Sequence, residues 1–302
     1  MTDGLQARAK RATLPAMRLF LLTALTMLAF AGNSLLNRFA VADAAMAPTS
    51  FALVRVLAGA GILVLLLAVR HARTGVGMMP HINGNAVGGV IGLTTYLAGF
   101  SLAYLELGAG PGALILFGCV QITMFAGAVM RGQRLALRRV LGAGVAFAGL
   151  LTLLWPGATP LPLLAAMAMV AAGIGWGIYS LAGSTRTDPL AGTAVNFVLA
   201  APVMALIWWG MGAAPLGGLG LGAAIASGAI TSGLGYALWY AVIPGLGAQR
   251  AAVAQLCVPV IAAAGGALWL GEGVGWRFGL ASVLVLGGVA LASLQRGITG
   301  RS

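Results

Sequence analysis

The sequence predicts an all-α membrane protein whose ten transmembrane helices form two inverted five-helix repeats. Three observations predict this fold: an apolar composition, basic residues concentrated on one side of the predicted spans, and an internal repeat. Of the 302 residues, 60% are hydrophobic and only 7% are charged, and the mean hydropathy is +1.00. A soluble domain carries about 25% charged residues. The composition therefore excludes a soluble enzyme, a disordered chain and a secreted disulfide domain.

Ten apolar segments are each close to the length of about 20 residues that a spanning helix needs. They cover residues 17–37, 49–69, 84–104, 108–130, 138–155, 161–182, 190–210, 218–241, 247–270 and 277–295. The connections are short, so we expect neighbouring helices to be antiparallel, with no soluble domain between them. The 47 glycines suit such a bundle, because glycine lets helix backbones approach closely in a bilayer.

The distribution of basic residues predicts the orientation of these spans. With the N-terminus in the cytoplasm, 14 of the 17 lysines and arginines fall on the cytoplasmic side, Arg38 and Arg277 fall on the opposite side, and Arg55 lies within a span. This asymmetry follows the positive-inside rule and places both termini in the cytoplasm. The formal net charge of +12 therefore reflects the orientation of the spans in the membrane, and we expect no nucleic-acid partner.

An internal repeat divides the chain into residues 1–156 and 157–302. Residues 107–150 align without a gap to residues 246–289, so that Leu107, Gly108 and Ala109 recur as Leu246, Gly247 and Ala248. Each repeat would hold five helices, and because five is odd the two copies have opposite orientations. Inverted repeats are typical of secondary transporters, in which the substrate site lies near the membrane midplane between the halves.

The titratable residues do not favour catalysis or metal binding. The five acids lie in loops or at helix ends, and both histidines lie in one polar loop. An intramembrane enzyme would need a nucleophile with a base, or clustered metal ligands, so we predict no enzyme activity, no metal and no cofactor. Proton-coupled carriers commonly keep an ionisable residue at mid-membrane depth. Facilitated diffusion and coupling through another group both stay open.

Polar and aromatic side chains at membrane depth are the candidate substrate-binding residues, because such groups are costly against lipid. They are Asn33, Asn37, Tyr96, Gln121, Trp176, Tyr179, Tyr236, Trp239, Tyr240 and Gln255. The amides have an alternative role in bonding between helices, and Trp239 and Tyr240 lie near a helix end where the headgroup interface also suits them. A cavity of amides, hydroxyls and rings with little charge suits a neutral or zwitterionic metabolite.

Arg55 and Pro259 are candidate gating or structural residues. Arg55 lies about six residues into the second span, roughly 9 Å deep at the helical rise per residue. A structural or gating role, direct contact with substrate, and passive snorkelling to the headgroups are the three readings of this position. Pro259 lacks a backbone N–H, so it leaves a carbonyl one turn earlier, at Gln255, without its usual partner.

Three stretches of the chain resemble the EamA family of the drug/metabolite transporter superfamily. They are PTSFALVR, MRGQRLALRRVLGAGVAFAGL and LWLGEGVGWRFGLASVLVLGGV, the last of which contains an acid, Glu272, that matches the family's acidic residue. The first repeat departs from the family pattern at Gln133, where an acid is common, and at Val120, where proline is frequent, whereas Pro259 keeps the proline.

The resemblance implies a small-molecule exporter in the bacterial inner membrane that works by alternating access. Within the family, exporters of amino acids, including aromatic ones, or of similar small metabolites are the predicted branch. Its partners would be a small-molecule substrate and the lipid bilayer, and the oligomeric state stays open. The alternatives are export of drugs or other metabolites, a non-transporting membrane scaffold, and an intramembrane enzyme.

Overall fold

The computed structural model describes residues 15–77, 85–130, 132, 137–154, 162–183 and 188–293, and all regular structure in these ranges is helical. The α-helices are α2 (Ala16–Arg38), α3 (Pro48–Thr74), α4 (Asn85–Ala103), α5 (Ala109–Met130), α6 (Leu137–Leu154), α7 (Leu163–Gly183), α8 (Pro189–Gly210), α9 (Gly220–Ala226), α10 (Gly235–Gln255), α11 (Cys257–Trp269) and α12 (Trp276–Ser293). Two π-helices complete the bundle, η2 (Phe39–Asp43) after α2 and η3 (Ser227–Leu234) between α9 and α10. The predicted all-α class is confirmed.

The described helices are long and apolar enough for a membrane protein. Seven helical segments meet the length and hydropathy of a membrane span, and three shorter apolar helices cover Val140–Leu153, Cys257–Trp269 and Trp276–Leu291. The shorter helices occupy the positions predicted for the fifth, ninth and tenth spans. The protein is therefore a multi-helix membrane protein, while a crossing by each of the three shorter helices stays a prediction.

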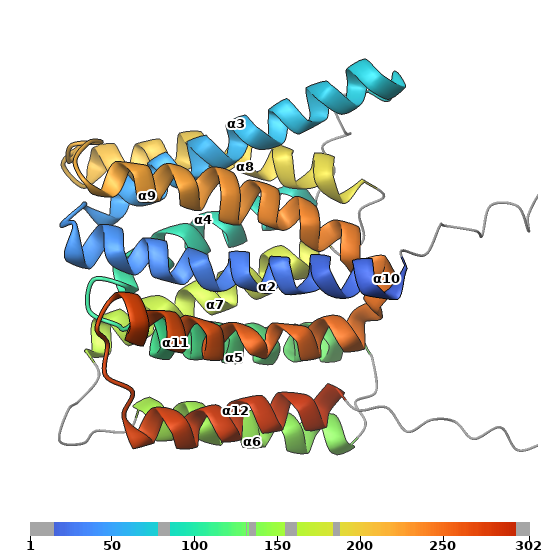
Figure 1. Ribbon diagram of the computed structural model, residues 1–302, viewed down its shortest axis with the longest axis vertical. Coiled ribbons are helices and arrows are strands. Elements are labelled where there is room, and N and C mark those ends of the chain that lie inside the picture. The colour runs from blue at the N-terminus through green and yellow to red at the C-terminus, as the bar shows by residue number, and fades with distance from the viewer. Residues whose placement is uncertain are drawn as a thin grey trace, which may run out of the picture.

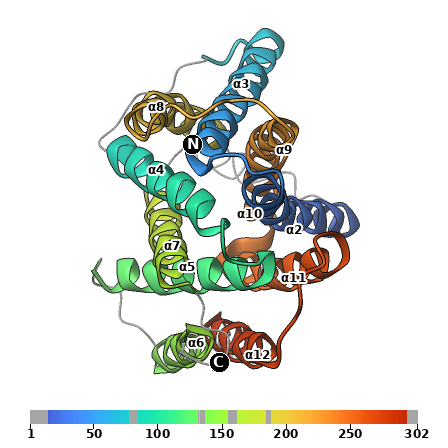
Figure 2. The same ribbon diagram turned by 90° about the vertical axis from the view of Figure 1, so that its left-hand side faces the viewer.

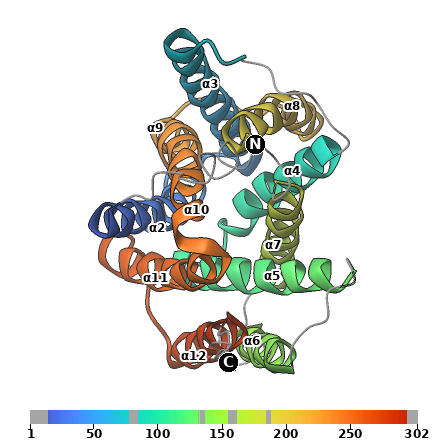
Figure 3. The ribbon, with the colours of Figure 1, turned by 90° about the vertical axis from the view of Figure 1, so that its right-hand side faces the viewer.

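The helices run side by side, with their connecting turns gathered at the two ends of the bundle (Figure 1). Three contacts join helices that are five predicted spans apart: α3 packs on α8, α5 on α11 and α6 on α12. Figure 2 and Figure 3, which look along the bundle from its two ends, show α6 and α12 together at one edge and α3 at the opposite edge. Between these edges lie α2, α4, α7 and α10, which carry most of the candidate site residues.

Helices α4 and α7 pack closely against each other at two glycines, Gly92 and Gly175. A Cβ atom added at Gly92 would lie 2.6 Å from the carbonyl oxygen of Gly175, and one added at Gly175 would lie 2.7 Å from the carbonyl oxygen of Gly92. Any side chain at either position would push the two backbones apart. This close approach follows from the small residues of the two helices, and it sets the distance between the aromatic rings that they carry.

The chain after α8 is less regular than the sequence predicts. Residues 218–241 were expected to form one span and residues 247–270 the next, but the helix that begins at Gly235 continues to Gln255 and breaks at Leu256. The break lies three residues before Pro259, which takes the third position of α11, where the missing N–H costs no intrahelical hydrogen bond. Proline thus separates α10 from α11, in place of the loop expected around residues 242–246.

Candidate functional site

Four helical segments meet in one buried hydrogen-bond network centred on the Tyr96 hydroxyl of α4. Asn33 of α2 donates to this hydroxyl through Nδ2 at 2.9 Å, and Arg55 of α3 donates to it through Nη2 at 2.7 Å. Arg55 also donates through Nε to the Ser232 hydroxyl of η3 at 3.0 Å. The network therefore ties α2, α3, α4 and η3 together at the level of the predicted cavity.

The π-helix η3 supplies further hydroxyl groups to the same network. The Asn33 Oδ1 atom accepts from the Ser227 hydroxyl at 2.5 Å and from the Thr231 hydroxyl at 3.2 Å. Ser227, Thr231 and Ser232 are all buried. Irregular π-turns occur frequently at functional sites. Sequence reasoning missed Ser227, although three hydroxyl residues within one apolar segment were the available signal.

Aromatic rings from both halves of the chain form a cluster beside this network. The Trp176 ring of α7 lies 4.8 Å from the Tyr96 ring and 4.9 Å from the Tyr236 ring of α10, centroid to centroid, and it stacks on Tyr179 at 5.2 Å. Phe30 of α2 places its ring against Tyr236 at 5.9 Å. Such tilted and edge-on pairs are favourable ring geometries, and they join α2, α4, α7 and α10.

These groups enclose a small central cavity. Its lining residues are Phe30, Asn33, Ser34, Tyr96, Phe100, Leu116, Phe117, Trp176 and Tyr236. The cavity volume is about 20 Å³, which is room for about one water molecule. The cavity is closed in the sense that it has no room for an amino acid, and binding a metabolite requires the rings to separate.

The structure brings together five of the predicted binding residues, namely Asn33, Tyr96, Trp176, Tyr179 and Tyr236, whereas the other five differ in position. Asn37 lies one turn further along α2 and donates to the Ser101 hydroxyl at 3.2 Å. Trp239 is half-buried and contacts Phe30, with their ring centroids 5.7 Å apart. Gln121 and Gln255 are buried but are not among the residues that line the cavity. The Tyr240 side chain lies outside the described residues, although its backbone is part of α10.

Arg55 is fully buried, so the snorkelling interpretation is wrong. Its guanidinium carbon lies 4.9 Å from the Tyr96 ring centroid and 5.1 Å from that of Phe100, both within cation–π range. Among the residues that the structure describes, neither the buried Nη1 atom of Arg55 nor the buried Tyr236 hydroxyl has a hydrogen-bond partner. A buried polar group left without a partner costs about 1–3 kcal/mol. The centre of the bundle therefore holds one cation, the Arg55 guanidinium, and two hydrogen-bond donors that lack an acceptor among the described residues, Nη1 of Arg55 and the Tyr236 hydroxyl.

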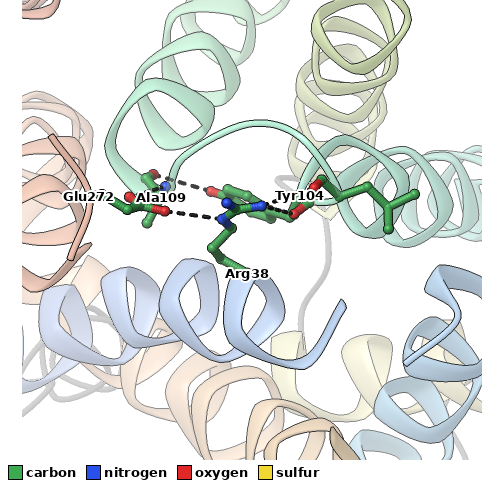
Figure 4. Close-up of polar contacts among 5 residues, drawn as sticks. Arg38, Tyr104, Ala109 and Glu272 are labelled. Atoms are coloured by element: carbon green, nitrogen blue, oxygen red, sulfur yellow. Dashed lines mark hydrogen bonds and ion pairs between the residues drawn. The ribbon is translucent and has the colours of Figure 1, made fainter. Parts of the chain in front are cut away.

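An ion pair between Arg38 and Glu272 lies at one end of the bundle, and Figure 4 shows its contacts. The Nε atom of Arg38, at the end of α2, lies 3.1 Å from Oε1 of Glu272, and Nη1 donates to the backbone oxygens of Tyr104 and Leu105, each at 3.0 Å. Glu272 Oε2 accepts from the backbone N–H of Ala109 at 2.8 Å. The pair thus connects α2, the turn between α4 and α5, and the turn between α11 and α12. Sequence reasoning identified Glu272 only through the family resemblance and did not pair it with Arg38.

A second ion pair lies at the opposite end, which sequence reasoning also missed. Arg70 of α3 places Nη2 2.8 Å from Oδ2 of Asp188 and donates through Nη1 to Oδ1 at 3.1 Å. Asp188 also caps α8 by accepting from the Ala191 N–H at 3.1 Å. Partial burial raises the pKa of Asp188, but the hydrogen bonds from Arg70 and from Ala191 outweigh burial, so the pKa lies below its ordinary value.

Both ion pairs join residues of different halves of the chain. Arg38 and Arg70 belong to residues 1–156, whereas Glu272 and Asp188 belong to residues 157–302. Helices α2 and α3 run in opposite directions, so Arg38, in the last turn of α2, and Arg70, four residues before the end of α3, lie at opposite ends of the bundle (Figure 1). The closed cavity therefore has one inter-half ion pair on either side of it.

Comparisons with known proteins identify the family. The EamA-like transporter family model matches residues 163–294. The chain is 46% identical over 284 residues to an uncharacterized protein of Pseudomonas aeruginosa, a match that covers 94% of this chain and 97% of the relative. A protein of known crystal structure shares the fold with a TM-score of 0.64 at 19% identity, covering 91% of this chain and 97% of that chain. The chain therefore belongs to the EamA-like transporter family, whose members move small metabolites across membranes and are not enzymes.

Proposed function

We propose that this transporter exports amino acids, aromatic or otherwise neutral, or similar small metabolites across the bacterial inner membrane by alternating access. The observation that supports it is the closed aromatic cavity, which has walls from both halves of the chain. Asn33, Tyr96 and Phe117 come from the first half, and Trp176 and Tyr236 come from the second. Because residues of both halves line this site, a tilt of one half against the other changes the side of the membrane from which the site can be reached.

The packing of the helices supports two inverted five-helix repeats. In a two-fold repeat, α3 corresponds to α8, α5 to α11 and α6 to α12, and the members of each of these pairs are in contact. The repeat also relates α4 to the segment of η3 and α10, and α7 to α2. The contact between α4 and α7 therefore corresponds to the contact of η3 and α10 with α2, which the structure also contains. Proline opens both α3, at Pro48, and α8, at Pro189. Arg55 and Asn196 each lie seven residues after that proline. The repeat would thus place corresponding polar residues at the same depth from opposite sides.

The two ion pairs supply the gates for this cycle. In our proposal, Arg38–Glu272 closes the outer end and Arg70–Asp188 closes the cytoplasmic end, in agreement with the orientation that the basic residues predict. Loading from the cytoplasm separates Arg70 from Asp188, and release separates Arg38 from Glu272. Both pairs are formed while the cavity is closed, which corresponds to the occluded intermediate of such a cycle.

The composition of the site suits a zwitterionic cargo. Tyrosine hydroxyls and the Asn33 amide offer hydrogen bonds, and the Trp176 and Tyr236 rings offer faces for an apolar or aromatic side chain. A phosphorylated metabolite would call for several inward cations, and Arg55 is the one arginine or lysine that the described residues place beside this cavity. The site therefore favours an amino acid over a sugar phosphate.

A resistance and export screen tests the proposal. Cells that overproduce the protein are grown with toxic amino-acid analogues, and amino acids in the medium are quantified against cells carrying the Trp176→Ala variant. We expect resistance to at least one analogue and export of the matching amino acid, both lost in the variant. Trp209, which is 72% exposed at the end of α8, provides the matched control Trp209→Ala. Equal export with and without the protein across the whole panel would overturn the proposal.

A further inference from the structure

We propose that Arg55 binds the carboxylate of the transported molecule, so that the transporter accepts amino acids and small organic acids and rejects cationic amines that lack a carboxylate. This inference rests on the proposed function, and it adds the chemical group by which the site recognises its cargo. Arg55 then acts as a specificity-determining residue, in addition to its structural hydrogen bonds.

The Arg55 charge lacks a counterion among the described residues. Glu272 and Asp188 are bound to Arg38 and Arg70 at the ends of the bundle, while Asp43 and Glu106 are exposed. The fifth acid, Asp3, precedes the described residues. A buried charge is expected to be paired, and the two rings beside Arg55 only partly replace a counterion. A substrate carboxylate would complete the pair.

The Arg55 guanidinium is held in place by two hydrogen bonds, while one of its donor groups has no acceptor among the described residues. Tyr96 accepts from Nη2 and Ser232 accepts from Nε, whereas Nη1 has no hydrogen-bond partner. The planar guanidinium matches a carboxylate better than an ammonium group would, because its donors form a rigid fork. The Tyr236 hydroxyl, also buried without a partner, offers a second donor in the cavity wall. These are donors prepared for an acceptor-rich ligand.

Arg55 lies next to the cavity, in contact with residues that line it, although it is not a lining residue itself. The guanidinium lies against Tyr96 and Phe100, and both of these residues line the cavity. Admission of an amino acid requires Tyr96 to move away from Trp176, since the cavity is too small while these rings are 4.8 Å apart. Because the Tyr96 hydroxyl is bonded to Arg55, such a movement would widen the cavity on the side of Arg55. The position that the repeat relates to Arg55 holds the neutral Asn196, so Arg55 supplies the positive charge that the described residues place beside the cavity.

Ligand binding to the purified full-length protein tests this inference without a tracer. L-leucine and L-phenylalanine are compared with their carboxamides, which keep the side chain and lose the carboxylate, and 3-phenylpropionate is compared with phenethylamine. The readout is the concentration dependence of the melting temperature. We expect the carboxylates to bind at least about tenfold more tightly than their partners, because a charge-assisted hydrogen bond is worth that factor or more.

Three variants assign this preference to Arg55. Arg55→Gln should fold and lose the carboxylate preference, and Arg55→Lys should keep part of it, because the charge stays and the fork is lost. Arg277→Gln removes the same charge from a half-buried position at the start of α12 and should keep the preference in full. If Arg55→Gln does not fold, the Arg55→Lys measurement decides.

The outcomes separate this inference from the proposed function. Binding and proteoliposome uptake of carboxamides or phenethylamine as strong as those of the carboxylates would overturn the role of Arg55 and leave a transporter in place. An Arg55→Gln variant with an unchanged carboxylate preference would also overturn the role of Arg55. So would an Arg55→Lys variant that keeps both the full preference and the full affinity for carboxylates. Absence of binding and uptake for every compound would overturn both proposals.

Discussion

Arg38 and Glu272, 234 residues apart in the sequence, join the end of the first described helix to the turn before the last one, with Nε and Oε1 3.1 Å apart. Glycine makes room for the carboxylate, because a Cβ atom at Gly108 would lie 3.0 Å from its Oε2 atom. The pair is partly buried, with the two side chains 21% and 16% exposed. It is therefore shielded from solvent more than an ordinary surface ion pair.

Neutralising Glu272 should loosen this end of the bundle. Glu272→Gln keeps an oxygen that can accept from the Ala109 N–H but removes the charge that holds Arg38. In a background without Cys119 and Cys257, a cysteine replacing the buried Ser101 of α4 should react at least several-fold faster with a membrane-impermeant maleimide added from outside. An unchanged labelling rate would contradict a gating role for the pair, and Glu106→Gln, an exposed acid of the same end, is the control.

Asp188 has two roles that substitution separates. Asp188→Asn keeps an acceptor for the cap of α8 and loses the ion pair with Arg70, whereas Asp188→Ala loses both. We expect the melting temperature to fall in the order wild type, Asn variant, Ala variant. Equal melting temperatures of the two variants would show that the cap contributes nothing.

The pH dependence of the same pair follows from the lowered pKa of Asp188. A carboxyl whose folded pKa is depressed contributes stability above its unfolded pKa, about 4 for aspartate, and loses it as the pH falls through the folded value. The difference in melting temperature between wild type and Asp188→Asn should therefore be constant from about pH 5 to 8 and shrink below about pH 4. A difference that changes steadily between pH 6 and 8 would contradict this assignment.

Tyr96 and Tyr236 both lie at the central site, so replacing each with phenylalanine compares a hydroxyl inside the hydrogen-bond network with one outside it. Tyr96→Phe removes the acceptor of both Asn33 and Arg55 and should cost about 1–3 kcal/mol of unfolding free energy. Tyr236→Phe removes a hydroxyl that makes no hydrogen bond within the described part of the chain, so stability should be unchanged or slightly higher, while substrate affinity falls. Denaturation in detergent measures the first effect and ligand titration the second. Equal losses of stability in the two variants would contradict the network.

The contact of α4 with α7 should be sensitive to a single methyl group. Gly92→Ala would place Cβ 2.6 Å from a backbone oxygen, and overpacking of this kind costs about 1–3 kcal/mol. Because these helices carry Tyr96 and Trp176, transport should fall as well. Gly144→Ala, in α6 with no atom within 4 Å of the added Cβ, should be neutral in a melting and uptake assay. A neutral Gly92→Ala would show that the helices separate easily.

Outside the stretch that forms α10 and α11, the helices were predictable to within about five residues, because a membrane span is encoded locally, by its length and apolarity. The predicted spans 49–69 and 190–210 correspond to α3 and α8, which extend from Pro48 to Thr74 and from Pro189 to Gly210. The π-helix η3 was not predictable, since its wide turns depend on the contacts of Ser227 and Thr231 with Asn33.

The site was predictable in its residue types but only partly in its geometry. Asn33, Tyr96, Trp176 and Tyr236 were selected because polar groups avoid lipid, and that physical rule acts on each residue separately. The pairing of Arg38 with Glu272, and the burial of Arg55 between Tyr96 and Ser232, depend on which helices meet in three dimensions. A count of residues from a helix end does not contain that information.

Substrate counterflow into proteoliposomes tests the central claim, that the cavity between the two halves is a transport site, most directly. Vesicles preloaded with an unlabelled amino acid are diluted into the labelled compound, and uptake is followed over time. We expect saturable, transient accumulation that Trp176→Ala abolishes and Trp209→Ala preserves. Absence of counterflow across a broad panel of amino acids and small carboxylates, or full counterflow by Trp176→Ala, would contradict it.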